Sequence, residues 1–444
     1  MAHIVILGNG IAGITTARHV RKQSNDSITV VSGETEYFYS RTALMYIFMG
    51  HMTFDHTKPY EDWFWKKNKI DLVHKWVEDI DFDQKKLVYA DGTHLDYDKL
   101  VLAVGSKPNK FGWPGQDLPG VQGLYSYQDL EKLEENSKKV QRAVIVGGGL
   151  IGIELAEMLL SRGISVTMLV REKGFWSSVL PQEEAQLITN HIREHHVDLK
   201  LETELKEIVA GEDGRVTKVI TNTGEEIACQ LVGLTAGVSP NVEFLRSTEL
   251  EINRGIRVSR ALETNIKDVY ALGDCAEFTE PVSGRRPLEQ VWYTGRMMGE
   301  ALAKTLTGTR TEYSPGPWFN SAKFFDIEYQ TYGTVLSKLP ENQVGFYWQA
   351  ENQNVAVHVV FEKASEKFVG INVFGVRMRH ERFDRWLRDG VKVEFVLEHL
   401  KDANFDPEFF KPYEESILKA YNMAFNRDLT PKKKSWKRIF SLSN

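Results

Sequence analysis

The chain has 444 residues, of which 42% are hydrophobic and 26% are charged, and its formal net charge at pH 7 is -6. Such a length predicts roughly two to four domains, and so small a charge does not favour nucleic acid as a partner. Two cysteines, Cys229 and Cys275, are too few for a disulfide scaffold or a Cys-X-X-Cys metal or redox site, and no metal site is predicted.

The N-terminal residues 1–7 lead directly into an apolar run and lack the features of a signal peptide. No apolar run approaches the roughly 20 residues that a membrane-spanning helix needs. We therefore expect a cytoplasmic protein without an integral membrane segment.

The first predicted element is a βαβ unit. An apolar run at residues 4–7 leads into a Gly-X-Gly-X-X-Gly turn, a helical pattern and a second apolar run at residues 28–31. In such a turn the glycines allow a tight bend, close approach to a pyrophosphate, and helix packing. The second strand ends near two candidate ribose ligands, Ser32 and Glu34, of which Glu34 is favoured. The predicted dinucleotide contacts here are Gly8, Gly10, Ile11, Ala12, Gly13, Ser32 and Glu34.

Aromatic residues and a buried strand follow this unit. Trp63, Phe64, Trp65 and Trp76 form a dense cluster that predicts core packing rather than stacking on a nucleic acid. The apolar run at residues 100–105 predicts a buried strand that ends in a loop, and the composition of residues 111–115 is typical of a crossing between domains.

A second βαβ unit repeats the pattern at residues 143–170. Its glycine turn predicts a second dinucleotide site. Its second strand ends in Arg171 and Glu172, where an arginine favours the 2′-phosphate of NADPH and an acid favours NADH. Both coenzymes stay open, with NADPH ahead. The predicted contacts are Gly147, Gly149, Leu150, Ile151, Gly152 and Arg171, and a later buried strand ends at Gly237.

The last part of the chain has a different pattern. Residues 313–317 are rich in turn formers and predict a domain boundary. Alternation at residues 355–361 and 368–373 predicts antiparallel strands. The basic segment 431–440 predicts a solvated tail, with contact to an anionic surface as the alternative.

These elements, in this order, resemble the pyridine nucleotide-disulfide oxidoreductase superfamily over about residues 1–333. The resemblance also rests on residues 95–108 and on residues 269–276, which match the family's second FAD motif. It implies that Asp274 contacts the ribityl chain of FAD and that main-chain atoms of Val77 hold the adenine. The further cofactor contacts implied are Ala103, Gly105 and Gly273.

Two shorter segments resemble one branch of this superfamily. Tyr39-Ser40-Arg41 and residues 317–321 are similar to ferredoxin and rubredoxin reductases and to the flavin part of assimilatory nitrite reductases. By this resemblance Arg41 lies beside the flavin pyrophosphate.

The implied fold is α/β, with two Rossmann-like domains and a C-terminal α+β interface domain. The FAD-binding domain is predicted at residues 1–115 and 238–315, and the NAD(P)H-binding domain is inserted at residues 116–237. The interface domain is predicted at residues 316–425 and is followed by a basic tail at residues 426–444. In the family such a domain often mediates homodimers or contacts a redox partner.

The implied activity is transfer of a hydride from NAD(P)H to FAD. Glu154 and Glu289 match family positions near the nicotinamide, although a helix at residues 287–303 that merely docks on the FAD domain is the alternative for Glu289. The family's disulfide reductases carry a cysteine pair in the segment that matches residues 37–50, which has none here. Disulfide reduction is therefore not expected, and Cys275 is predicted to be a small packed residue.

Three functions of the reduced flavin stay open. The favoured acceptor is a small iron protein of the ferredoxin or rubredoxin type. The alternatives are direct reduction of a quinone, oxygen or another small molecule, and a non-catalytic redox-sensing flavoprotein.

Overall fold

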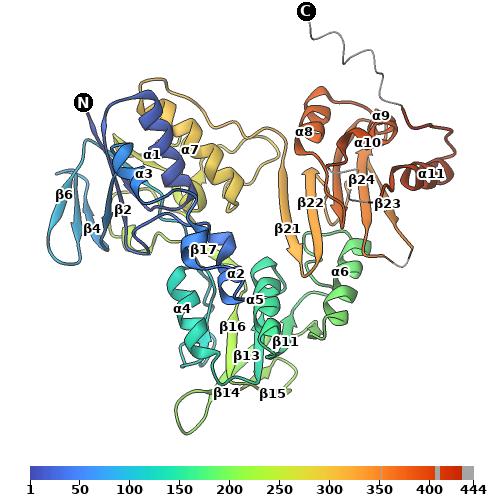
Figure 1. Ribbon diagram of the computed structural model, residues 1–444, viewed down its shortest axis with the longest axis horizontal. Coiled ribbons are helices and arrows are strands. Elements are labelled where there is room, and N and C mark those ends of the chain that lie inside the picture. Colours follow the sequence, from blue (N-terminus) through green and yellow to red (C-terminus); the bar gives the residue numbers. More distant parts are fainter. Residues whose placement is uncertain (352, 406–410, 433–444) are drawn as a thin grey trace, which may run out of the picture. The chain divides into compact units, whose positions relative to one another are not determined.

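The computed structural model describes residues 1–351, 353–405 and 411–432. Contacts divide the chain into two compact units (Figure 1). Unit 1 consists of Met1–Arg171 and Asp198–Pro315, and unit 2 of Glu172–Val197 and Gly316–Asn444. The basic segment from residue 433 onward, for which a solvated tail is predicted and surface contact is the alternative, lies outside the described residues.

Unit 1 contains a first parallel sheet built around the N-terminal strand. Its strands stand in the order β19-β7-β1-β2-β3, and every neighbouring pair is parallel. The carboxyl ends of these strands therefore lie along one edge, where ligands bind in doubly wound folds. The bounds are β1 (His3–Leu7), β2 (Ser27–Ser32), β3 (Asp71–His74), β7 (Lys99–Leu102) and β19 (Val269–Ala271).

Two helices of unit 1 pack closely against each other, and the first of them also contacts this sheet. Helix α1 (Ile11–Gln23) packs against α7 (Trp292–Leu306). A Cβ at Gly299 of α7 would lie 2.8 Å from the carbonyl oxygen of Ala12. The glycine therefore allows an approach that no larger residue would permit.

The second parallel sheet of unit 1 repeats the first. Its order is β12-β11-β10-β16-β9, again with parallel neighbours throughout. The two sheets confirm the predicted doubly wound α/β architecture. The bounds are β9 (Val121–Gln122), α4 (Tyr127–Asn136), β10 (Arg142–Val146), α5 (Leu150–Ser161), β11 (Ser165–Val170), β12 (Asp198–Leu201) and β16 (Leu231–Leu234).

Small antiparallel sheets and one parallel pair, β18 with β20, complete unit 1. Two three-stranded sheets are present, β4-β5-β6 and β13-β14-β15. The antiparallel pair β8 and β17 lies where the chain crosses between the two parallel sheets. The bounds are β4 (Val77–Asp81), β5 (Lys86–Tyr89), β6 (His94–Asp96), β8 (Ser106–Pro108), β13 (Leu205–Ala210), β14 (Val216–Thr221), β15 (Glu226–Ala228), β17 (Val238–Pro240), β18 (Ile256–Val258) and β20 (Ala276–Phe278). Shorter helices are α2 (Leu44–Phe48) and α3 (Trp63–Lys67).

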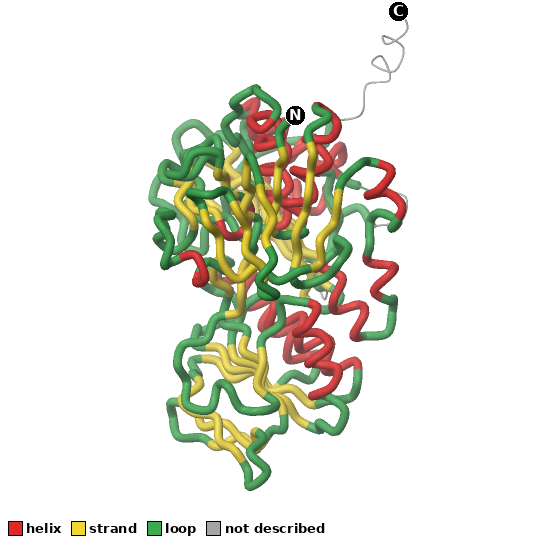
Figure 2. The backbone as a smooth tube through the Cα atoms, turned by 90° about the vertical axis from the view of Figure 1, so that its left-hand side faces the viewer, coloured by secondary structure: helices red, strands yellow, loops and turns green. Residues whose placement is uncertain are grey.

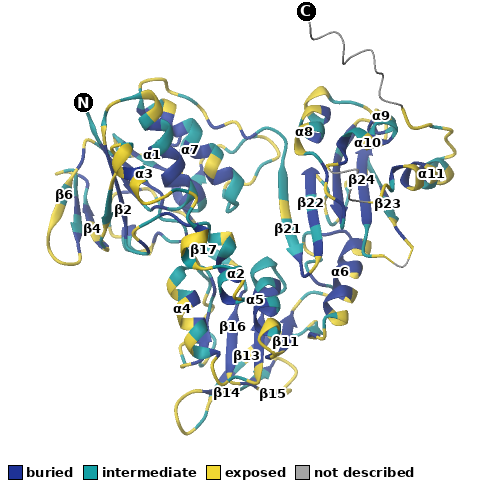
Figure 3. Cartoon of the chain, viewed as in Figure 1, coloured by how far each residue is buried: buried dark blue, intermediate teal, exposed yellow. Residues whose placement is uncertain are grey.

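Unit 2 is built on one antiparallel sheet in the order β21-β22-β25-β24-β23. This confirms the antiparallel strands that alternation predicts. Strands β22 and β24 are largely buried (Figure 3), and helices of unit 2 pack against the sheet. Figure 2 distinguishes the helices of the chain from its strands by colour. The bounds are β21 (Phe319–Phe324), β22 (Ile327–Gly333), β23 (Gln343–Gln349), β24 (Ala356–Glu362), β25 (Phe368–Phe374), α8 (His380–Asp389), α9 (Val393–Glu398), α10 (Leu400–Ala403) and α11 (Glu414–Phe425).

Helix α6 (Gln182–Glu194) also belongs to unit 2. Its buried Glu184 accepts a hydrogen bond from Asn372 Nδ2 at 2.8 Å and lies 2.9 Å from His358 Nδ1. Burial of this carboxyl raises its pKa, against the effect of His358. These contacts join α6 to β24 and β25, although residues 172–197 fall in the predicted nucleotide-binding range. The domain boundaries remain a prediction.

Two local expectations are wrong. Helix α7 begins at Trp292 rather than at residue 287, because the carbonyl of Pro287 accepts a hydrogen bond from Phe278 and holds this segment extended beside β20. Of the aromatic cluster, Trp65 is buried, but Trp63 and Trp76 are 56% and 64% exposed.

Among the described residues, no helix combines the length and the apolar character needed to cross a membrane.

Candidate functional site

The first glycine of each turn has a backbone conformation and a neighbour that exclude any side chain. Gly8 has φ +114° and Gly147 has φ +125°. A Cβ at Gly8 would lie 2.1 Å from the carbonyl oxygen of Ala103, and one at Gly147 would lie 2.6 Å from that of Thr235. Each turn is thus pressed against the residue that directly follows a neighbouring strand of its sheet, β7 or β16.

The second and third glycines of the two Gly-X-Gly-X-X-Gly turns have equivalent surroundings. A Cβ at Gly13 would meet the Gly8 carbonyl oxygen at 2.1 Å, and one at Gly152 would meet that of Gly147 at 2.6 Å. By contrast, the Cβ positions of Gly10 and Gly149 have no heavy atom within 4 Å. The turns therefore pack tightly on one side and are open on the other.

The open side of each turn faces the beginning of a long helix. Helices α1 and α5 start with Gly10 and Gly149 as N-caps, without a side-chain cap and without an acid in the first turn. Their first N–H groups and the positive end of the helix dipole suit an anionic group. The predicted contacts Ile11, Ala12, Leu150 and Ile151 supply these N–H groups. Both places fit a dinucleotide pyrophosphate.

A charged pair lies where β2 ends. Arg41 donates from Nη1 to Glu34 Oε1 at 2.9 Å and from Nη2 to Oε2 at 2.7 Å. Glu34 Oε1 also accepts from the Tyr39 hydroxyl and from the Tyr127 backbone N–H. Burial alone would raise the pKa of Glu34, but the hydrogen bonds and charge of Arg41 lower it overall. The carboxylate is therefore held in its ionised form.

The acid of the second FAD-like motif lies beside a tyrosine far away in sequence. The Tyr125 hydroxyl donates to Asp274 Oδ2 at 3.2 Å and accepts from the Ser106 N–H at 3.0 Å. Arg41 lies over the Tyr125 ring, with Cζ 4.4 Å from its centroid. Burial raises the pKa of Asp274, against hydrogen bonds from Tyr125 and Ser106. These contacts connect the Glu34–Arg41 pair with Asp274.

Glu154 lies in α5, shortly after the second glycine turn. It is partly buried and has no hydrogen-bond or ion-pair partner among the described residues. Burial raises the pKa of Glu154 to about 7, and the negative charge of Glu157 contributes to this shift. A carboxyl group with this pKa changes its charge near neutral pH.

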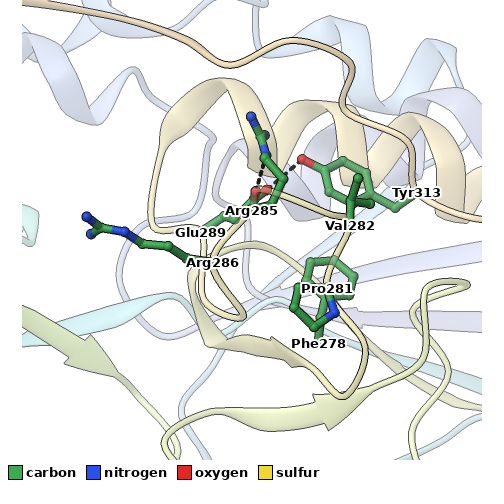
Figure 4. Close-up of a pocket in the computed structure, with 7 residues that line it drawn as sticks. All are labelled: Phe278, Pro281, Val282, Arg285, Arg286, Glu289 and Tyr313. Carbon is green, nitrogen blue, oxygen red and sulfur yellow. Dashed lines mark hydrogen bonds and ion pairs between the residues drawn. The ribbon is translucent and has the colours of Figure 1, made fainter. Parts of the chain in front are cut away.

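Glu289 is engaged in a buried ion pair. Its Oε1 lies 2.5 Å from Arg285 Nε and its Oε2 accepts from the Tyr313 hydroxyl at 2.7 Å. Figure 4 shows both side chains directed at this carboxylate, while Arg286 points away. Since Phe278 stacks on Tyr313, the group packs as a unit beside a small pocket. The carboxylate is occupied by protein partners, and its place near the nicotinamide stays a prediction.

The other predicted contacts surround these groups. Ser32 is buried, and its hydroxyl accepts from the Glu34 N–H at 3.2 Å. Val77 is buried beside Trp76, whose ring would lie 2.3 Å from a Cβ at Gly33. Arg171 is exposed at the end of β11. Gly105, Gly237 and Gly273 have positive φ angles of 66°, 88° and 73°, which suit the turns that follow their strands.

Both cysteines are buried inside unit 1. Cys275 donates weak hydrogen bonds to the carbonyls of Leu272 and Leu102. Burial raises the pKa of Cys229 and of Cys275 to about 12. Neither thiol is therefore ionised at neutral pH, and the predicted packing role of Cys275 agrees with this environment.

Sequence reasoning missed Tyr125. The polar group also includes Tyr39, from the Tyr39-Ser40-Arg41 motif, and Gln290, which follows Glu289 in the predicted helix at residues 287–303. Gln290 Nε2 donates to Ser106 Oγ at 2.8 Å. One signal for Tyr125 was available, because Ser126 and Asp129 form a capping box at the start of α4. This pattern places Tyr125 just before a helix, but it does not predict that the side chain reaches Asp274.

Comparisons with known proteins agree with this geometry. Residues 2–299 match the family described as pyridine nucleotide-disulphide oxidoreductase. The chain is 27% identical over 419 residues to the assimilatory nitrate reductase electron transfer subunit of Bacillus subtilis, covering 93% of this chain and 52% of that protein. It therefore spans about half the length of that relative.

Two further proteins are similar over most of their length. Rhodocoxin reductase of Rhodococcus erythropolis is 31% identical over 332 residues, which cover 72% of this chain and 76% of that protein. The solved structure of an NAD-dependent persulfide reductase from A. fulgidus is similar with a TM-score of 0.82 and 25% identity, covering 96% of this chain and 83% of that one.

Proposed function

Because the chain belongs to the pyridine nucleotide-disulphide oxidoreductase family, we propose that it passes electrons from NAD(P)H through FAD to a small iron redox protein. It is an FAD-dependent oxidoreductase of NAD(P)H. The observation that carries the proposal is the pair of equivalent glycine turns in unit 1, each open in front of a helix N-terminus. The absence of cysteine from residues 37–50 argues against a disulfide acceptor.

The first turn is proposed to hold FAD. The N–H groups at the start of α1 bind the pyrophosphate, and Glu34 accepts from the adenosine ribose. Glu34 Oε2 accepts only from Arg41 among the described residues, so it retains capacity for a ribose hydroxyl. Asp274 accepts from the ribityl chain, while Tyr125 fixes the direction of its carboxylate.

The second turn is proposed to hold NAD(P)H. The N–H groups at the start of α5 bind its pyrophosphate, and Glu154 lies near the nicotinamide. FAD, when bound, supplies the chemistry that accepts a hydride and releases electrons singly. The contribution of this chain is therefore to bind, orient and electrostatically favour the reacting groups.

The acceptor is tested by anaerobic titration followed by a coupled assay. We expect NADPH or NADH to bleach the flavin absorbance, and a ferredoxin or rubredoxin to accelerate reduction of cytochrome c. Equal turnover with oxygen or a quinone, without a carrier protein, would indicate direct reduction at the flavin. A bound flavin that neither coenzyme bleaches would indicate a redox sensor.

The coenzyme preference is tested at Arg171. If NADPH is the natural coenzyme, Arg171→Ala should weaken its use by at least about tenfold, since a guanidinium–phosphate contact contributes about 1.5–3 kcal/mol, and should leave NADH unchanged. The measurement is kcat/KM for both coenzymes, with the exposed Lys173→Ala as the matched control. An equal loss with both coenzymes would assign Arg171 to packing instead.

A further inference from the structure

Two histidines one helical turn apart meet an aspartate within unit 2. His191 lies in the last turn of α6 and His195 is its C-cap residue. Asp326 lies in the turn between β21 and β22. One ligand-type atom of each residue lies within 4.8 Å of the others. The arrangement is outside both glycine turns and the polar group around Asp274.

The two imidazole rings approach the same oxygen of the Asp326 carboxylate. His191 Nε2 lies 2.7 Å and His195 Nε2 lies 3.4 Å from Asp326 Oδ1. His191 is 2% exposed, and the ring of His195 stacks on Phe325 at 4.2 Å with an interplanar angle of 8°. The two imidazoles are therefore held in place by packing before any ligand binds.

The hydrogen bond on the far side of His195 determines what its Nε2 can do. His195 Nδ1 lies 3.0 Å from the backbone carbonyl oxygen of His191, which can only accept. Nδ1 must therefore carry the hydrogen, and in the neutral ring Nε2 presents a lone pair. This lone pair lies close to the Asp326 carboxylate, because Nε2 is 3.4 Å from Oδ1. The repulsion is relieved by a proton or by a cation between the two groups.

The surroundings favour a metal cation. A histidine that donates from Nδ1 to a backbone carbonyl is the arrangement that fixes Nε2 for metal binding. For His191, Glu194 Oε2 lies 3.6 Å from Nδ1, and Asn354 Nδ2 lies 3.0 Å from it and donates to it. Turning the Asn354 amide over places its Oδ1 there, so that Nδ1 donates and Nε2 presents its lone pair to a metal. The C-terminal end of α6 adds partial negative charge.

We propose that His191, His195 and Asp326 bind one divalent transition-metal ion, zinc foremost, through the two Nε2 atoms and a carboxylate oxygen. Two imidazoles and one carboxylate are a ligand set that zinc takes, with a water in the fourth position. Asp326 has a side-chain exposure of 74%, so the fourth position is open to solvent. The metal fastens the end of α6 to the β21–β22 turn.

The test is a calorimetric titration of the untagged, FAD-loaded, full-length chain with zinc chloride after treatment with a chelator. We expect one zinc per chain and a rise in the thermal midpoint. His195→Ala and Asp326→Ala should each weaken binding by at least about tenfold. His196→Ala is the matched control, because this neighbouring histidine is exposed and outside the cluster, and it should bind zinc like the parent.

Cobalt(II) provides a second readout that does not depend on stability. Its visible absorption should show low-symmetry coordination with nitrogen ligands in the parent and in His196→Ala, and should be lost in His195→Ala. Two results would overturn the proposal. One is zinc binding that is equal in all variants, and the other is no stoichiometric binding by the parent, which would leave the cluster as two histidines in contact with a carboxylate.

Discussion

Replacing Asp274 by alanine is expected to give a folded chain that loses FAD on gel filtration. The carboxylate is proposed to accept hydrogen bonds from the ribityl hydroxyls, and Tyr125 and Ser106 already hold it in place. Hydrogen bonds to a charged group contribute about 1.5–3 kcal/mol, so we expect FAD to bind roughly 10–100-fold more weakly. The measurements are the ratio of flavin to protein absorbance and the Kd from quenching of FAD fluorescence.

Two further variants test whether the loss of FAD is specific to the Asp274 carboxylate. Asp83→Ala changes an exposed acid of the same unit and should retain FAD. Tyr125→Phe removes only the hydroxyl that contacts Asp274 and should weaken FAD less than Asp274→Ala does. Full flavin retention by Asp274→Ala would remove this carboxylate from the cofactor site.

Replacing Glu154 by glutamine is expected to slow flavin reduction about tenfold at pH 8 and to remove its dependence on pH near 7. Departure of the hydride leaves a positive charge on the nicotinamide, which a nearby carboxylate favours. Because the pKa of Glu154 is raised to about 7, the parent should react faster as the pH rises through this value. Anaerobic stopped-flow reduction by NAD(P)H, recorded from pH 6 to about 8.5, measures this effect.

The same variant has a predictable effect on stability. A raised carboxyl pKa means that the folded chain keeps a proton that the unfolded chain releases above about pH 4.5. The parent therefore loses stability as the pH rises from about 4.5 to 7, by at most about 3.5 kcal/mol at about 1.4 kcal/mol per unit. Glu154→Gln should be more stable than the parent at pH 8 and similar to it at pH 4, as measured by urea unfolding.

Glu157→Gln tests whether the pH dependence of flavin reduction follows the pKa of Glu154. The charge of Glu157 contributes to the raised pKa of Glu154, so its removal should shift the midpoint of the pH–rate profile downward. A pH profile that stays the same in Glu154→Gln would mean that another group titrates during flavin reduction.

The sequence by itself determined the two nucleotide-binding halves and the antiparallel strands of the C-terminal part. Gly8 and Gly147 are predictable because a backbone with positive φ, pressed against a carbonyl, accepts no side chain. The strands are predictable because apolar runs and alternation record which faces are buried. Both signals are local, so they are present without knowledge of the remaining chain.

Only the tertiary structure decided which polar groups meet. Tyr125 and Asp274 are 149 residues apart, and His191 and Asp326 are 135 apart. Nothing in the sequence around either partner encodes the other. The start of α7 was misplaced for the same reason, since the segment before it is held extended by Phe278 of β20 rather than by its own propensity. Such pairs form because the sheets bring distant loops together, and hydrogen bonds and ion pairs then depend on geometry that residue order does not carry.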